Sequence, residues 1–310
     1  MHPVLIDFSF LNIGWIFTWF FDLLGREPPG AFKLHTYGLM IAIGFLVGTQ
    51  LGAREARRVD LDGKGRFDQF ILDLTFWILL VSMAGARLLF IIVEWDTVYS
   101  RDPLKMFKIW EGGFVFYGGF LAALIFSVAY SRAHGRNFFL VADTLIPSVA
   151  LGHFFGRLGC VAAGCCWGVE VDPDFPLAIQ YPAGAQAHAS MVGAGVIGHS
   201  AAFTPHVHPV QLYEAFGELS LFFILIFTRT IKRFHGQVLL TYLFLYPILR
   251  TSLEFIRGDK ARGEYLIFGA KVSTSQIISI LVATAAVTLL VTLVRRRKAA
   301  AAPTAQTAPA

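Results

Sequence analysis

Residues 156–168 read GRLGCVAAGCCWG and directly follow an apolar run that covers residues 146–155. Arg157 therefore lies at the end of a hydrophobic segment, where an arginine side chain costs about 2.5–3.5 kcal/mol on membrane-insertion scales. The segment also holds four glycines and all three cysteines of the chain. Glycine lets backbones approach closely, and a thiol reacts only where its environment favours the thiolate. This segment is the strongest candidate for a functional site.

The composition predicts a polytopic membrane protein. Of the 310 residues, 55% are hydrophobic and 15% are charged, and the mean hydropathy is +0.60. A soluble domain is rarely so apolar, and several runs reach the roughly 20 residues that a bilayer requires. The net charge of +5 fits basic loops beside membrane spans, so no nucleic-acid partner is expected.

An all-α fold with about seven transmembrane helices is predicted within a membrane domain of residues 34–298. The expected spans are approximately residues 34–51, 70–93, 114–130, 138–155, 210–228, 236–253 and 277–294. Residues 1–33 are predicted to lack a cleavable signal peptide and to form an interfacial segment, because the apolar stretch 8–24 is short and interrupted by polar residues. The Ala/Pro/Thr-rich tail 299–310 is predicted to be disordered.

The distribution of basic residues predicts the orientation. The loops after the first, third, fifth and seventh spans are strongly basic, which makes them cytoplasmic by the positive-inside rule. The N-terminus is then outside and the C-terminus cytoplasmic. The region between spans four and five carries no lysine or arginine and is long enough for a small external head at about residues 165–208.

Three arginines are predicted at membrane depth or at its edge: Arg87, Arg157 and Arg250. Each needs an anionic partner or a wet cavity. We expect structural pairing for Arg87, and phosphate binding for Arg157 and Arg250, because a guanidinium matches a phosphate and stays charged. Glu254 lies one helical turn after Arg250 and is a candidate partner. The other candidates are Glu94, Glu111, Asp143 and Glu214.

Two further polar patterns open predicted spans. Tyr117 lies between the glycine pairs of the run 112–119, which indicates either tight helix packing or a functional hydroxyl. His208 lies just before the fifth span, where a histidine is often a helix cap. Gln211 and Glu214 follow three residues apart on one face, which favours a lumen-facing surface.

The cysteines leave several interpretations open. Cys160, Cys165 and Cys166 could ligate a metal with His153, but the spacing matches no zinc module and three thiols in a line give no tetrahedral frame. No metal and no cofactor are therefore predicted. A disulfide is possible at an oxidising exterior, and thiols packed at a close helix contact are the default.

Together these motifs resemble the prolipoprotein diacylglyceryl transferase family. Arg257 follows the last matching motif, and the motifs occur in family order over most of the chain, from about residue 35 to residue 280. The matching pieces are residues 35–40 (HTYGLM), 85–87 (GAR), 112–119, 156–159 with 167–168, 208–214, and 249–255 (LRTSLEF).

The resemblance implies a fold of seven membrane helices with an external head, in the bacterial cytoplasmic (inner) membrane. It implies transfer of the diacylglyceryl group of phosphatidylglycerol to the lipobox cysteine thiol of preprolipoproteins, with release of glycerol phosphate. Membrane lipid and the lipobox peptide are the implied partners. The catalytic residues expected are Arg157, Arg250, Tyr117 and His35. The substrate-binding residues expected are Tyr37, Arg87, Arg157, Gly168, His208, Gln211, Glu214 and Glu254.

The chain departs from the family pattern at the acceptor side. The family's Asn, Asn and Glu after the arginine are Cys160, Ala163 and Cys165 here, and its histidine between the glycine pairs is Tyr117. A tyrosine with a pKa near 10 is a poor base at neutral pH. The base is then an assisted Tyr117, His35 or Glu214. The alternatives are a paralogous transferase with another acceptor and a non-enzymatic lipid-binding protein or transporter.

Overall fold

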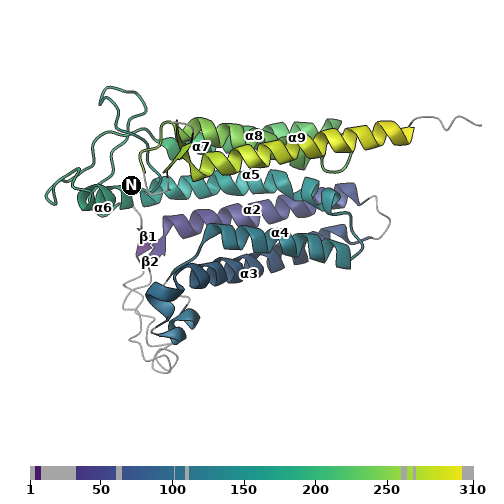
Figure 1. The fold of residues 1–310 in the computed structure, drawn as a ribbon, viewed down its shortest axis with the longest axis horizontal. Helices are drawn as coiled ribbons and strands as arrows, with labels where there is room; N and C mark the ends of the chain where they lie inside the picture. The colour runs from purple at the N-terminus through teal and green to yellow at the C-terminus, as the bar shows by residue number, and fades with distance from the viewer. Residues whose placement is uncertain are drawn as a thin grey trace, which may run out of the picture. The chain divides into compact units, whose positions relative to one another are not determined.

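The computed structural model describes residues 4–7, 33–60, 65–100, 102–108, 112–259, 264–267 and 270–301. Long helices dominate these residues (Figure 1). They are α2 (Thr36–Val59), α3 (Phe67–Val93), α4 (Phe116–Ala133), α5 (Phe138–Ala163), α7 (Val210–Ile231), α8 (Gln237–Glu254) and α9 (Thr274–Ala301). Each corresponds in position to one predicted span.

Shorter elements connect them. A π-helical turn, η2 (Trp95–Tyr99), and a 3-10 helix, η3 (Pro103–Phe107), follow α3, and α6 (Gln186–Gly193) lies between α5 and α7. Two antiparallel pairs of strands were not expected from an all-α pattern. They are β1 (Val4–Asp7) with β2 (Lys33–His35), and β3 (Glu264–Ile267) with β4 (Ala270–Ser273).

The chain is a polytopic membrane protein. In the described part of the chain, six helices are long and apolar enough to cross a membrane: α2, α3, α4, α5, α7 and the residues Thr274–Thr292 of α9. Helix α8 is not among the six. It carries both Arg250 and Glu254 within its 18 residues, and these charges lower its suitability as a span.

Several predicted boundaries are wrong for identifiable reasons. His35 ends strand β2, so the first membrane helix begins at Thr36 rather than at residue 34. Helix α5 does not end at residue 155 but continues to Ala163, and the chain then turns at Gly164, whose φ of +68° suits glycine. Arg157 is therefore a helical residue. The predicted interfacial helix 8–24 and residues 302–310 of the tail lie outside the described residues.

The chain divides into two compact units, each described here by itself. One unit comprises Gly48–Ser148 and Phe234–Gly236, and the other comprises Met1–Val47, Val149–Arg233 and Gln237–Ala310. In the first unit, α3 and α4 pack closely because Gly85 and Gly118 face each other. A carbon added at Gly118 would lie 2.4 Å from the Gly85 carbonyl oxygen. The glycine pair at 118–119 thus serves helix packing.

In the second unit, α7, α8 and α9 lie side by side (Figure 1). The start of α2 contacts α5 at Gly159, where an added carbon would lie 3.0 Å from the Tyr37 ring. The segment between α5 and α7 is folded around a small core of Tyr181, Ala185, Ala187 and Val207. Isolated β-bridges, such as the one between Ile179 and Val207, hold this core together.

Substituting Gly85 by alanine should destabilise the protein. The new methyl group would lie 2.4 Å from the Ala122 Cβ and 2.7 Å from the Gly118 carbonyl oxygen, so α3 and α4 would have to separate. We expect a loss of about 1–3 kcal/mol, measured as a lower unfolding temperature in detergent. The matched control is Gly152→Ala, whose methyl group would lie 4.0 Å from the Gly44 carbonyl oxygen. Equal unfolding temperatures for the two variants would contradict this packing.

Candidate active site

A buried ion pair between Arg157 and Glu214 forms the centre of the site. Arg157 Nη2 lies 2.7 Å from Glu214 Oε1, which joins α5 to α7 across 57 positions of sequence. The Glu214 side chain is fully buried and that of Arg157 is 12% exposed. Because each charge is costly in an apolar surrounding, the pair constrains the two helices to be neighbours.

A second polar pair lies one helical turn away. His153 precedes Arg157 by four residues on α5, and Glu218 follows Glu214 by four residues on α7. His153 Nδ1 lies 2.7 Å from Glu218 Oε1, and Arg157 Nε donates to His153 Nε2 at 3.3 Å. A neutral imidazole with its proton on Nδ1 satisfies both contacts. Sequence reasoning considered His153 only as a metal ligand and missed Glu218, although its spacing from Glu214 could have found it.

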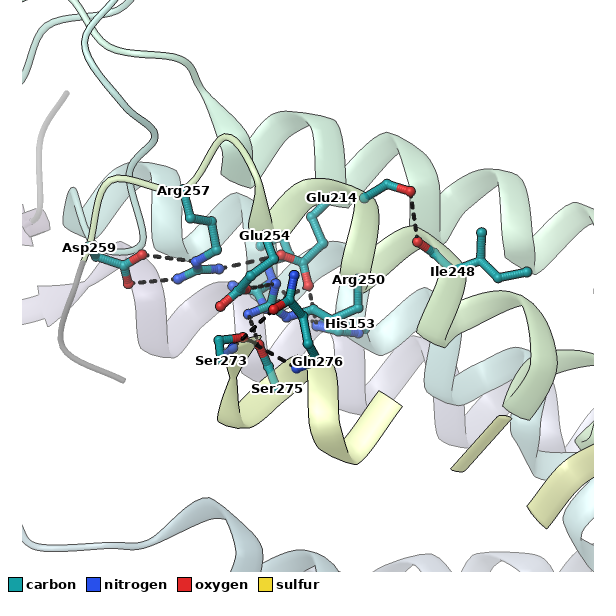
Figure 2. Close-up of polar contacts among 12 residues, drawn as sticks. His153, Glu214, Ile248, Arg250, Glu254, Arg257, Asp259, Ser273, Ser275 and Gln276 are labelled. Atoms are coloured by element: carbon teal, nitrogen blue, oxygen red, sulfur yellow. Dashed lines mark hydrogen bonds and ion pairs between the residues drawn. The ribbon is translucent and has the colours of Figure 1, made fainter. Parts of the chain in front are cut away.

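Arg257 contacts the same carboxylate from the loop after α8 (Figure 2). Its Nη1 lies 3.8 Å from Glu214 Oε2, while Nε and Nη2 form a two-pronged pair with Asp259 at 2.8 and 2.6 Å. Glu214 is thus flanked by two guanidinium groups. Burial lowers the pKa of Arg257, but Asp259 and then Cys166 favour its charged form, and the net effect raises the pKa. Arg257 matched a family motif but was not predicted as a site residue.

Arg250 pairs with Glu254, as the spacing of one helical turn predicted. Arg250 Nη1 lies 2.5 Å from Glu254 Oε2, and Nη2 donates to Ser275 Oγ at 3.4 Å (Figure 2). Ser275 belongs to the first turn of α9, so this arginine also connects α8 to α9. The predicted structural partner is therefore confirmed, while a phosphate role for Arg250 stays a prediction.

Gln211 connects α7 to the head segment, residues 165–208 between α5 and α7. Its Nε2 donates to the Cys165 carbonyl oxygen at 2.6 Å and to the Tyr181 hydroxyl oxygen at 2.7 Å. Gln211 is fully buried on the same face of α7 as Glu214, which agrees with the polar stripe predicted from their spacing. Burial raises the pKa of Tyr181, so its hydroxyl stays protonated at neutral pH.

The three cysteines converge, although Cys160 is separated from Cys165 and Cys166 by four residues. Cys160 lies in the last turn of α5, and left-handed backbone at Gly164 (φ +68°) and Cys166 (φ +61°) folds the chain back. The three Sγ atoms lie within 4.8 Å of one another, and none of the three cysteines forms a disulfide. Hydrogen bonds from the other two thiols, followed by the charges of Arg257 and Arg157, lower the pKa of Cys166.

Gly168 and His208 meet at a backbone junction. The Gly168 amide donates to the His208 carbonyl oxygen at 3.0 Å, and an added carbon at Gly168 would lie 2.6 Å from the His208 Cβ. Gly168 also forms a β-bridge with Arg257. The N-terminal cap of α7 is Pro209, and the His208 ring instead lies with Nδ1 3.2 Å from the Tyr213 hydroxyl oxygen. The junction thus places Arg257 beside the head segment.

Arg87, in the other unit, has backbone carbonyl groups as its hydrogen-bond partners within the described part of the chain, from which Glu111 is missing. Its guanidinium donates to the carbonyl oxygens of Lys105, Met106, Lys108, Gly112 and Gly113. These carbonyls belong to η3 and to the loop before α4, where helix hydrogen bonds are incomplete. The contacts support the expected structural role.

A pocket of about 520 Å³ lies beside Arg87 in the same unit. Its lining is otherwise apolar and consists of Met83, Ala84, Leu88, Ile91 and Phe114. Tyr117 belongs to this unit as well, in the first turn of α4, and is 44% exposed with its ring against Phe116. Tyr37 is 43% exposed in the first turn of α2, in the unit that holds Arg157. The side chain of His35 lies outside the described residues.

These features define a multi-pass helical membrane protein with a buried cluster of arginines and acids beside three thiols. The model of the prolipoprotein diacylglyceryl transferase family matches residues 28–292. The chain belongs to this family.

Relatives named phosphatidylglycerol–prolipoprotein diacylglyceryl transferase support the assignment. The one from Methylococcus capsulatus is 35% identical over 243 residues, which cover 77% of this chain and 84% of the relative. The one from Cronobacter sakazakii is 31% identical over 275 residues, covering 86% and 92%. A relative from Clostridium perfringens, named phosphatidylglycerol–prolipoprotein diacylglyceryl transferase 2, is 29% identical over 250 residues, which cover 81% of this chain and 87% of the relative.

Replacing Glu214 by glutamine should destabilise the protein by about 3–5 kcal/mol. The change removes the charge that compensates Arg157 and contacts Arg257, and a buried guanidinium is then left without its anion. Chemical unfolding in detergent micelles measures the effect. The control is Glu170→Gln at an exposed position, for which we expect a change within about 0.5 kcal/mol. Similar stability of both variants would refute a central role for the Arg157–Glu214 pair.

Proposed function

We propose that the protein transfers the diacylglyceryl group of phosphatidylglycerol to the thiol of a lipobox cysteine in a preprolipoprotein and releases glycerol phosphate. Family membership and the names of the relatives support the reaction and both substrates. The acceptor's sulfur forms a bond to a glyceryl carbon while the bond between that carbon and the phosphate oxygen breaks. The electron pair leaves with glycerol phosphate.

The geometry of Arg157 carries this proposal. Among the described residues, its hydrogen bonds use Nε and Nη2, toward His153 and Glu214, which leaves Nη1 available. Its side chain is partly exposed, unlike that of Glu214. A guanidinium held rigidly at one edge can present its remaining donors to a phosphate oxygen without losing its own position. Arg157 would then stabilise the charge that develops on the leaving phosphate.

The other predicted site residues take supporting roles in this proposal. Arg250 and Arg257 contribute positive potential toward the phosphate, and Glu254 and Glu214 keep these arginines oriented. Tyr37 and His208 line the approach to α5 and to the head segment, with Gly168 and Gln211 holding the backbone there. The pocket at Arg87, within its own unit, has an apolar lining that suits an acyl chain. The base is Tyr117 with assistance, His35 or Glu214.

We also propose seven membrane spans, with α8 as the sixth, in the bacterial inner membrane. The N-terminus and the head segment 165–208 would face the exterior, and the C-terminus the cytoplasm. The basic residues after α2, α4, α7 and α9 support this orientation. A C-terminal green fluorescent protein fusion should fluoresce, and a C-terminal alkaline phosphatase fusion should be inactive. The opposite pattern would invert the topology.

A paralogous transferase with a different acceptor is the second candidate. The thiol cluster favours it, because two of its members, Cys160 and Cys165, stand at acceptor-side positions where the family pattern has Asn and Glu. The same lipid donor would be used in that case.

The test is glycerol phosphate release by purified protein in phosphatidylglycerol micelles with a lipobox peptide. Arg157→Lys should lower the rate at least about 100-fold, because an ammonium cannot keep the contacts to Glu214 and His153 and also bind the phosphate. A peptide with serine in place of the lipobox cysteine should give no product.

The control variant is Arg58→Lys, at an exposed position near the end of α2, which should keep the full rate. Release that persists in Arg157→Lys would remove this arginine from catalysis. Release that is independent of the peptide thiol would favour the second candidate function. No release by well-folded native protein would refute the transferase activity.

A further inference from the structure

The proposed reaction assigns no role to the three thiols at the end of α5. Cys160, Cys165 and Cys166 offer three sulfur atoms within 4.8 Å of one another at the C-terminal end of α5. Three thiolates around one zinc ion lie about 3.8 Å apart, given a Zn–S distance of about 2.3 Å. The observed spread therefore needs only small side-chain adjustments to become a coordination site.

The sequence argument against a metal was based on linear spacing, and the folded chain removes that objection. The turn at Gly164 and the left-handed conformation of Cys166 bring the two adjacent cysteines back toward Cys160. Gln211 then fixes this turn through its hydrogen bond to the Cys165 carbonyl oxygen. A fixed turn presents the three sulfurs from different directions, which three thiols in an extended segment could not do.

We propose that Cys160, Cys165 and Cys166 bind one thiophilic d10 cation, Zn²⁺ or Cu⁺, and that the acceptor thiol becomes its next ligand before transfer. His153 is excluded from the ligand set because its two ring nitrogens face Glu218 and Arg157. The site is thus a three-thiolate site with room for one more ligand, the arrangement typical of catalytic rather than structural metal sites.

The surrounding charges are consistent with a bound cation. Three thiolates packed together repel one another, so the cluster cannot ionise fully without a cation. With Zn²⁺ bound, three thiolates leave a net charge of about −1. Arg257 hydrogen-bonds Cys166, and Arg157 lies one helical turn before Cys160 on α5. Two guanidinium groups therefore lie beside a complex whose net charge they can stabilise.

The role in the reaction rests on the proposed function. A thiol that coordinates such a cation loses its proton to solvent, so the cation can replace a strong base at neutral pH. The thiolate then attacks the glyceryl carbon, and the phosphate leaves toward Arg157, the neighbour of the cluster on α5. The sulfur–carbon bond forms as the carbon–oxygen bond breaks, and no group is oxidised or reduced.

The metal site is tested first, without reference to activity. Full-length protein is purified in detergent under reducing, metal-free conditions and dialysed against Zn²⁺ or Cu⁺, and the bound metal is measured by mass spectrometry. We expect one equivalent per chain and a sulfur-to-metal charge-transfer band with Co²⁺ as the probe. The three cysteines are the only ones in the chain, so the Cys160→Ser, Cys165→Ser, Cys166→Ser triple variant is free of thiols and should lose the band.

Each single Cys→Ser variant should lower the affinity at least about 10-fold, because loss of a direct ligand exceeds the loss of an outer-shell partner. The unfolding temperature shows whether each variant is folded. Where a variant does not fold, metal binding by the native protein alone tests the proposal. Absence of tight binding of either cation would overturn the proposal. So would a mass-spectrometric alkylation count of one reactive cysteine in unreduced protein, which indicates a disulfide.

The acceptor role is tested on the Co²⁺-loaded protein. A lipobox peptide should strengthen the charge-transfer band by adding a sulfur ligand, and the peptide with serine should leave it unchanged. An unchanged band with both peptides would restrict the metal to a structural role and overturn the second half of the proposal. Metal binding without glycerol phosphate release would refute the proposed function alone, and release by metal-free protein would refute the metal's role alone.

Discussion

The ion pair between Arg157 and Glu214 constrains the structure around it more than any other contact. One helical turn away, His153 contacts Glu218, so two polar side-chain contacts connect α5 and α7. Two such contacts fix both the distance between the antiparallel helices α5 and α7 and their register, because a shift by one turn would separate each acid from its partner. The same constraint holds one edge of the Arg157 guanidinium still, which is what the proposed recognition of a lipid phosphate requires.

The sequence predicted those contacts that depend on helical periodicity. The position of each long helix followed from its apolar run, and the spacing of Arg250 and Glu254 indicated their ion pair. Contacts between distant segments could not be predicted in this way. Nothing in the spacing distinguished Glu214 from other acids as the partner of Arg157. Arg87 donates to backbone carbonyl oxygens, because short irregular turns after α3 leave such groups without helical partners.

The cysteines show how two backbone torsions change the chemistry of a segment. The sequence spacing of Cys160, Cys165 and Cys166 does not show that their sulfur atoms come together, so it predicts no coordination geometry. A glycine in the left-handed region, followed by a cysteine in the same region, turns the segment into a loop. A non-glycine residue at positive φ is uncommon and has a local cost, which the hydrogen bond of Gln211 to this loop helps to offset.

Helix α8 has a consequence for how the protein is assembled. It lies beside α7 and α9, yet it carries a charged pair near one end and falls outside the six helices that are apolar enough to cross by themselves. Its arginine is neutralised within α8 by Glu254 and anchored to α9 by Ser275. In the proposed seven-span arrangement, the translocon would release α8 into lipid only together with a neighbour, so α7, α8 and α9 would enter the bilayer as a group rather than one at a time.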